Sequence, residues 1–160
     1  MRKPAVSVIG GNAPTQTELL QAEEVGRLLA RAGAVVVCGG LGGVMEAACR
    51  GAKSAGGLTV GIIPGTDHDQ ANAYVDVVIP TGIGYARNAL VAYSGQAVIA
   101  VGGSSGTLSE MCFATFLDTP IFSLGSWTMT ERPIQMGSPP KLVRTPAEAV
   151  EAALEAIRGR

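Results

Sequence analysis

The residues best suited to chemistry form a glycine- and serine-rich loop in the second half of the chain. An apolar run over Ala97–Val101 is followed by a helical pattern from Thr107, and the loop between them holds Gly102, Gly103, Ser104, Ser105 and Gly106. Glycine lets a backbone approach an oxyanion closely because it has no Cβ. The first amide groups of a helix lack internal partners and lie at the positive end of its dipole. The loop therefore predicts a phosphate site, with the two serine hydroxyls as further donors.

Two ionisable residues could act beside this loop. Glu110 falls near the start of the expected helix, where its carboxylate either complements the dipole or acts on a bound molecule. Arg87 stands at the opening of an earlier helix, where the dipole disfavours a cation. A phosphate partner would explain that placement, and the alternative is a solvated surface arginine. The residues alone leave both alternatives open.

Two other apolar runs, at residues 5–9 and 34–38, also end in loops rich in glycine. Those loops contain Gly10, Gly11, Asn12, Gly39, Gly40, Gly42 and Gly43. In open parallel sheets, ligands bind beyond the carboxyl ends of the strands, at the point where the strand order reverses. We therefore expect all three loops to meet at one sheet edge and to form a phosphate or nucleotide site there.

Several other kinds of site are disfavoured by the sequence. It contains neither a GxxxxGK[ST] phosphate loop nor a strict GxGxxG dinucleotide motif. Asp67, His68 and Asp69 are adjacent and would point in different directions, so we expect a solvated loop and no metal site. Ser104 and Ser105 lack the histidine and the GxSxG turn that a serine nucleophile requires.

The composition indicates a single domain over residues 1–160. Hydrophobic residues make up 47% of the chain and charged residues 16%, which argues against disorder. A net charge of −1 and an aromatic content of 4% give no case for nucleic acid as a partner.

No apolar stretch is long enough for a membrane span. Cys38, Cys49 and Cys112 are isolated, which predicts buried thiols in a reducing cytoplasm.

Strand-like and helix-like segments alternate along the whole chain. Strands are expected at residues 5–9, 34–38, 58–63, 75–79, 97–101, 121–124 and 141–143, with helices between most of them. Uniformly apolar strands in such an order predict an α/β fold: a three-layer, Rossmann-like open parallel sheet of about seven strands with helices on both faces. Residues 125–140 read as a loop that forms either a lid or an interface.

Three motifs occur together in this chain. Residues 39–45 read GGLGGVM, Arg87 precedes Asn88, and residues 102–110 read GGSSGTLSE. Together they resemble the Rossmann-like family once labelled lysine-decarboxylase-like. That family includes the LOG phosphoribohydrolases, which release cytokinin bases from nucleoside monophosphates, and the molybdenum cofactor carrier proteins. The resemblance extends to about residue 124 and adds Met45 and Asn88 to the expected binding residues.

The loop departs from the family's PGGxGTxxE motif at two positions. Gly106, Thr107 and Glu110 match the motif, whereas Gly102 stands where proline is usual and Ser104 where the second glycine is usual. The altered loop is more similar to the carrier branch. That likeness implies a cytoplasmic homodimer or homotetramer that binds molybdenum cofactor, a phosphorylated pterin.

The arginine position carries a second difference. Arg87 matches the family's arginine, and Asn88 replaces the lysine common in the hydrolases. A phosphoribohydrolase stays open, because Arg87 and Glu110 are both present. The resemblance then implies that Arg87 holds the ribose phosphate and that Glu110 steers water or stabilises the developing oxocarbenium ion. A nucleotide sensor without chemistry is a third possibility.

Overall fold

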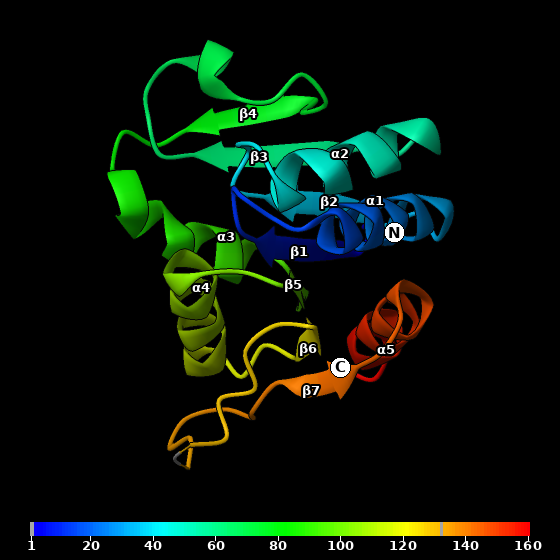
Figure 1. The fold of residues 1–160 in the computed structure, drawn as a ribbon, viewed down its shortest axis with the longest axis vertical. Helices are drawn as coiled ribbons and strands as arrows, with labels where there is room; N and C mark the ends of the chain where they lie inside the picture. Colours follow the sequence, from blue (N-terminus) through cyan, green and yellow to red (C-terminus); the bar gives the residue numbers. More distant parts are fainter. Residues whose placement is uncertain (1, 132) are drawn as a thin grey trace.

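A parallel sheet forms the centre of the protein (Figure 1). The computed structural model describes residues 2–131 and 133–160, and within them seven strands lie in the order β4-β3-β2-β1-β5-β6-β7, all parallel. The strands are β1 (Ala5–Gly10), β2 (Val35–Cys38), β3 (Thr59–Ile63), β4 (Val77–Pro80), β5 (Ala97–Val101), β6 (Ile121–Leu124) and β7 (Lys141–Val143). The Rossmann-like architecture predicted from the alternating pattern is confirmed.

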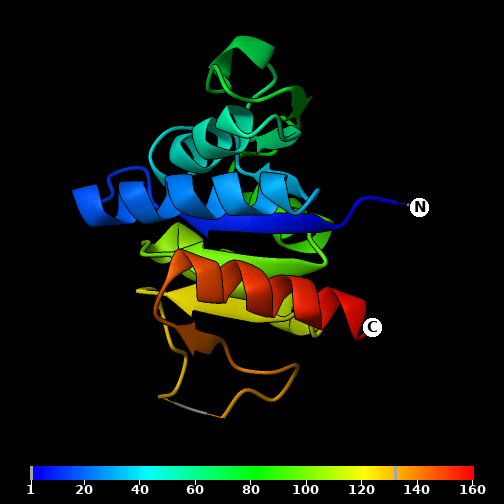
Figure 2. The ribbon, with the colours of Figure 1, turned by 90° about the vertical axis from the view of Figure 1, so that its right-hand side faces the viewer.

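Helices cover both faces of this sheet, as Figures 1 and 2 show. On one face lie α1 (Gln16–Arg31), α2 (Val44–Ser54) and α5 (Pro146–Arg158), and on the other lie α3 (Asn88–Ser94) and α4 (Ser105–Phe116). Side chains alternate between the two layers: Ile99 packs on the α1 side, whereas Val98 and Ala100 pack on the α4 side. Because both faces of β5 are covered, all five of its residues are fully buried.

The first two helices pack unusually closely because glycines lie at their contact. A Cβ on Gly26 of α1 would lie 1.9 Å from the carbonyl oxygen of Ala48, and a Cβ on Gly51 of α2 would lie 1.8 Å from that of Glu23. Both glycines are buried. The small residues therefore fix the position of α2, whose first turn faces the carboxyl edge of the sheet.

Three elements differ from those expected by more than a one-residue shift of a boundary. Strand β4 begins at Val77, because the backbone at Val75 is held in a turn by a bond to the Asn72 carbonyl. The helix expected from Tyr85 is a 3₁₀ turn, η2 (Gly84–Arg87), followed by α3. Helix α4 begins at Ser105, two residues before the expected start. Glu110 consequently lies in the second turn of α4.

The strand order places the three glycine-rich loops around one end of the sheet. Strand β1 pairs with β2 on one side and with β5 on the other, so the strand order reverses at β1. Ligands of open parallel sheets bind beyond the carboxyl ends of the strands at such a point. A short 3₁₀ helix, η1 (His68–Gln70), precedes β4, and no cluster of potential metal ligands occurs among the described residues.

The three cysteines differ in how deeply they are buried. Cys38 and Cys49 are buried, with sulfur atoms 3.5 Å apart, whereas Cys112 is half-buried, contrary to the expectation for all three. Its position on α4, a helix with exposed residues at its end, explains the difference.

In the described part of the chain, no helix has the length and apolar character needed to cross a membrane.

Candidate ligand-binding site

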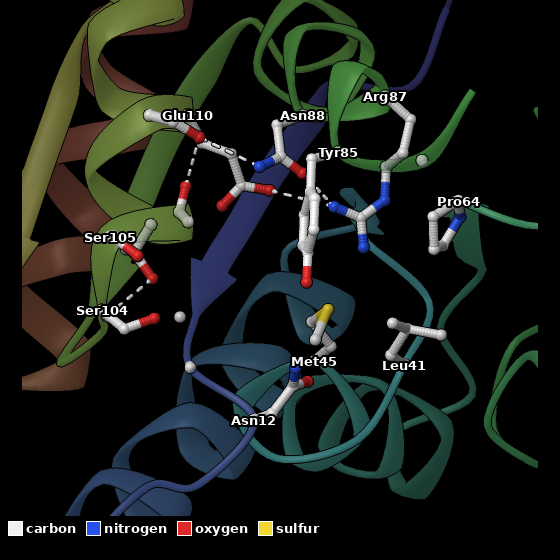
Figure 3. Close-up of a pocket in the computed structure, with 16 residues that line it drawn as sticks. Asn12, Leu41, Met45, Pro64, Tyr85, Arg87, Asn88, Ser104, Ser105 and Glu110 are labelled. Carbon is white, nitrogen blue, oxygen red and sulfur yellow. Dashed lines mark hydrogen bonds and ion pairs between the residues drawn. The ribbon is translucent and has the colours of Figure 1, made fainter.

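A cavity of about 590 Å³ opens beyond the carboxyl ends of β1, β2 and β5 (Figure 3). This volume is within the range typical of small-molecule sites. Most of the residues expected from the sequence line it: Gly10, Gly11, Asn12, Met45, Arg87, Asn88, Ser104, Ser105, Gly106, Thr107 and Glu110. The strand order thus brings together segments that are far apart in the chain.

The start of α4 forms one wall of the cavity. Ser104 is its N-cap residue, and its carbonyl accepts the first helical bond from the Leu108 amide at 3.0 Å. The amides of Ser105, Gly106 and Thr107 therefore have no carbonyl acceptor within the helix, and the Ser104 side chain caps the amide of Thr107. The Thr107 hydroxyl accepts a bond from the Ser104 amide at 3.3 Å and holds the turn. This wall offers amide donors and a positive dipole end to an anion.

Arg87 and Asn88 connect the end of β2 with the start of α4. The buried guanidinium of Arg87 donates to the Gly39 carbonyl at 3.2 Å and, through its other terminal nitrogen, to Asn88 Oδ1. Asn88 Nδ2 donates to Ser109 Oγ at 2.9 Å, and that hydroxyl donates to the Gly106 carbonyl at 2.7 Å. Within the described residues Arg87 Nε has no hydrogen-bond partner. Arg87 is thus held in place before any ligand arrives.

Glu110 faces Arg87 across the inner end of the cavity. Glu110 Oε1 lies 4.0 Å from Arg87 Nη1, and each side chain is 8% exposed. Burial raises the pKa of Glu110 to about 8, although the nearby Arg87 charge acts to lower it. Burial likewise lowers the pKa of Arg87. At neutral pH the Glu110 carboxyl is therefore mainly protonated and can donate a hydrogen bond, but it is a poor base in this state.

The opposite wall is more apolar, and sequence reasoning missed most of it. This wall contains Leu41, Pro64, Gly84 and Tyr85, and Ser109 on α4 is a further lining residue. Pro64 lies after β3, a strand that carried no glycine-rich loop signal. Tyr85 stands two residues before Arg87, and its closeness to that arginine was the one available signal.

Six of the expected glycines do not line this cavity: Gly39, Gly40, Gly42, Gly43, Gly102 and Gly103. Most of them serve close packing. A Cβ on Gly39 would lie 2.7 Å from both Arg87 Nη2 and Met45 Sδ, and a Cβ on Gly43 would lie 2.3 Å from the Gly11 carbonyl oxygen. Gly39 thus lets Arg87 approach the backbone, and Gly43 lets two loops meet.

Gly102 and Gly103 line a separate, smaller cavity with Glu18, Gly125, Ser126 and Trp127. Gly103 has φ +112°, a conformation that favours glycine, and a Cβ there would meet the Thr107 side chain. Trp127 Nε1 donates to the Ser104 carbonyl at 3.2 Å. The segment after β6 is therefore attached to the cap of α4, whereas its role as lid or interface stays a prediction.

One family of known proteins matches most of this chain. The model of the SLOG cluster4 family matches residues 3–153. The chain belongs to that family. The resemblance predicted from the motifs at residues 39–45, 87–88 and 102–110 is thus confirmed.

Solved structures resemble this SLOG cluster4 protein along its whole length. The molybdenum cofactor binding protein of the phototrophic bacterium Rippkaea orientalis is 36% identical, with a TM-score of 0.87 over 98% of this chain and 99% of that one. The Moco carrier protein of Chlamydomonas reinhardtii is 31% identical, with a TM-score of 0.86 over 99% of this chain and 100% of that one.

An enzyme is also similar, over a shorter region. A cytokinin riboside 5′-monophosphate phosphoribohydrolase of Mycobacterium tuberculosis is 36% identical over 116 residues, which cover 66% of this chain and 59% of the enzyme. The similarities therefore include both a binding protein and a hydrolase.

Proposed function

We propose that this protein binds a phosphorylated small molecule and acts as a carrier of molybdenum cofactor, a phosphorylated pterin. The observation that supports this most strongly is the full-length similarity to two proteins that bind or carry this cofactor. The phosphate would lie at the amides of Ser105, Gly106 and Thr107, and the ring would lie toward Met45 and Leu41.

The donors of the cavity fit such a cargo. Amides that lack a carbonyl partner at a helix start are suited to a phosphate, and the cavity volume of about 590 Å³ leaves room for a fused ring. The bonds of Arg87 to Gly39 and Asn88 make its guanidinium a fixed positive charge behind the phosphate. The protonated state of Glu110 fits binding better than it fits general-base chemistry.

Co-purification tests this proposal. The protein is expressed in cells that synthesise the cofactor, and bound molybdenum and pterin are then measured by mass spectrometry and by fluorescence after oxidation. We expect both to be retained by the wild type and lost from Ser105→Asp, because a carboxylate at the start of α4 repels phosphate while suiting the helix dipole. Ser105→Asn is the matched neutral control and should retain the cofactor. Wild-type protein that carries neither molybdenum nor pterin would contradict the proposal.

A phosphoribohydrolase is the second candidate, because Arg87 and Glu110 face each other within the cavity at 4.0 Å. In that case a fraction of ionised Glu110 would stabilise the oxocarbenium-like transition state. Incubation with AMP and an N6-substituted AMP, followed by chromatography, tests for the free base. Base release that Glu110→Ala abolishes would favour the enzyme, and its absence at pH 7 to 9 would remove this candidate.

A further inference from the structure

The most exposed aromatic side chain of the protein stands at the mouth of the cavity. Tyr85 is 88% exposed, and among the described residues it is the single aromatic side chain that lines the cavity. In Figure 3 its ring extends from the Arg87 side of the cavity toward Met45. Large apolar surface left in water at a concave site is typical of a ligand contact.

The other aromatic side chains already have partners. Tyr93, Phe113 and Phe116 form edge-to-face pairs, and Phe122 is buried in the core. The Trp127 indole donates to Ser104, and the Tyr74 ring lies 6.0 Å from the Arg50 guanidinium. Within the described residues, Tyr85 has no hydrogen-bond partner for its hydroxyl and no aromatic neighbour.

The backbone of Tyr85, by contrast, is fixed on both sides. The Gly84 amide donates to the Pro64 carbonyl at 3.0 Å, and Gly84 has φ +60°, which favours glycine. On the other side, the Asn88 amide donates to the Tyr85 carbonyl, and Arg87 is buried. The ring is therefore carried by a turn whose backbone is held on both sides, and Asn88, which bonds to this turn, also bonds to the Arg87 guanidinium.

We propose that the Tyr85 ring stacks on the flat conjugated ring of the bound phosphorylated ligand, so that the site selects phosphorylated ligands that carry such a ring over those that lack one. This inference rests on the proposed phosphate site at α4. The opposite side of the ligand ring would pack on Met45 and Leu41, whose apolar side chains line the same cavity. Stacking is tolerant of ring identity, because every aromatic base or pterin offers a π-face.

Three probes separate the ring contact from the phosphate contact: ribose 5-phosphate, AMP and GMP. GMP is included because guanine and pterin share an aminopyrimidinone ring. Calorimetry measures the affinity of the full-length wild type, Tyr85→Phe, Tyr85→Ala and Ile83→Ala for each probe. Ile83 is exposed and does not line the cavity, so it serves as the matched control. Chromatography of the same samples checks that the nucleotides stay intact.

We expect the wild type to bind AMP or GMP at least about tenfold more tightly than ribose 5-phosphate, and Tyr85→Ala to lose about tenfold for the nucleotides alone. Tyr85→Phe and Ile83→Ala should resemble the wild type. Equal wild-type affinity for the nucleotides and ribose 5-phosphate would overturn the stacking inference and leave the phosphate site intact. An equal loss for all probes in Tyr85→Ala would also overturn it. Failure of every probe to bind would refute the proposed phosphate site, and the inference with it.

Discussion

At the scale of single residues, the buried pair of Arg87 and Glu110 distinguishes this site from a simple phosphate loop. The two side chains approach within 4.0 Å with little exposure to solvent. Burial opposes ionisation of both groups: it lowers the pKa of Arg87 and raises the pKa of Glu110 to about 8. A carboxyl in this state can donate a hydrogen bond to a ligand oxygen, which suits a binding site.

The held proton predicts how stability depends on pH. The native state keeps the Glu110 proton to about pH 8, whereas the unfolded chain loses it near 4.5. The contribution of this group is full below 4.5 and is lost as the pH rises through 8, so the free energy of unfolding should fall across that range. Urea unfolding from pH 5 to 8.5 should show this decline in the wild type and a flatter profile in Glu110→Gln. Glu155→Gln, on the exposed face of α5, is the control and should keep the wild-type slope. Identical slopes in wild type and Glu110→Gln would contradict this assignment.

Most of the site residues predicted from the sequence line the cavity, and their contacts with a ligand stay a prediction. The positions of Arg87, Ser105 and Thr107 at the cavity can be predicted, because glycine-rich loops and helix starts have recognisable sequence patterns. Gly39 and Gly43 were expected at the ligand, yet they allow close packing against Arg87 and Gly11. A glycine that approaches a ligand and a glycine that approaches a neighbouring backbone have the same local pattern, so only the tertiary structure distinguishes them.

At the scale of elements, α1 and α2 are a tightly packed pair whose contact depends on glycine. Replacing Gly26 by alanine would place a Cβ 1.9 Å from the Ala48 carbonyl oxygen, so the helices must separate. We expect Gly26→Ala to lower the free energy of unfolding by about 2 kcal/mol despite its better helix propensity. Denaturant unfolding measures the change, and Leu20→Ala, at an exposed position of the same helix, should be nearly neutral. A Gly26→Ala protein as stable as the wild type would refute this reading of the contact.

The segment after β6 gives a second prediction for elements. Trp127 is the single tryptophan in the sequence, and its indole donates to the carbonyl of the α4 cap. An anion bound at Ser105–Thr107 should therefore change the fluorescence of Trp127. Trp127→Phe should lose this fluorescence signal. Its affinity for ribose 5-phosphate in calorimetry should stay within about threefold of the wild type, because the substitution removes only one exposed hydrogen bond. Unchanged emission at saturating ribose 5-phosphate would contradict the coupling.

Element positions followed from the sequence because the core is strongly patterned. The strand predicted at residues 97–101 has the same bounds in the structure, and the strand predicted at residues 5–9 is one residue longer. The turn η2 was not expected, because Gly84 with φ +60° and a bond to Pro64 set its shape, and the partner strand β3 is remote in sequence. Local propensity carries no information about such a contact.

At the scale of the whole molecule, the face made by α3 and α4 carries exposed apolar side chains. Leu90, Tyr93 and Phe116 are each more than 40% exposed on this face. Such patches are typical of protein interfaces, and the homodimer or homotetramer implied by the resemblance stays a prediction. Light scattering should show an oligomer for the wild type and a smaller species for Phe116→Asp. Leu20→Asp, on the opposite face, should leave the mass unchanged. A monomeric wild type would refute the prediction.

The central claim is that backbone amides at the start of α4 hold the phosphate of the ligand. Titration of ¹⁵N-labelled protein with ribose 5-phosphate, followed by amide NMR, tests it directly, because it locates the anion without assuming the ring. The account predicts that the largest shifts occur at Ser105, Gly106 and Thr107 and that Ser105→Asp abolishes them. Saturable shifts centred elsewhere, or none at millimolar ligand, would contradict it.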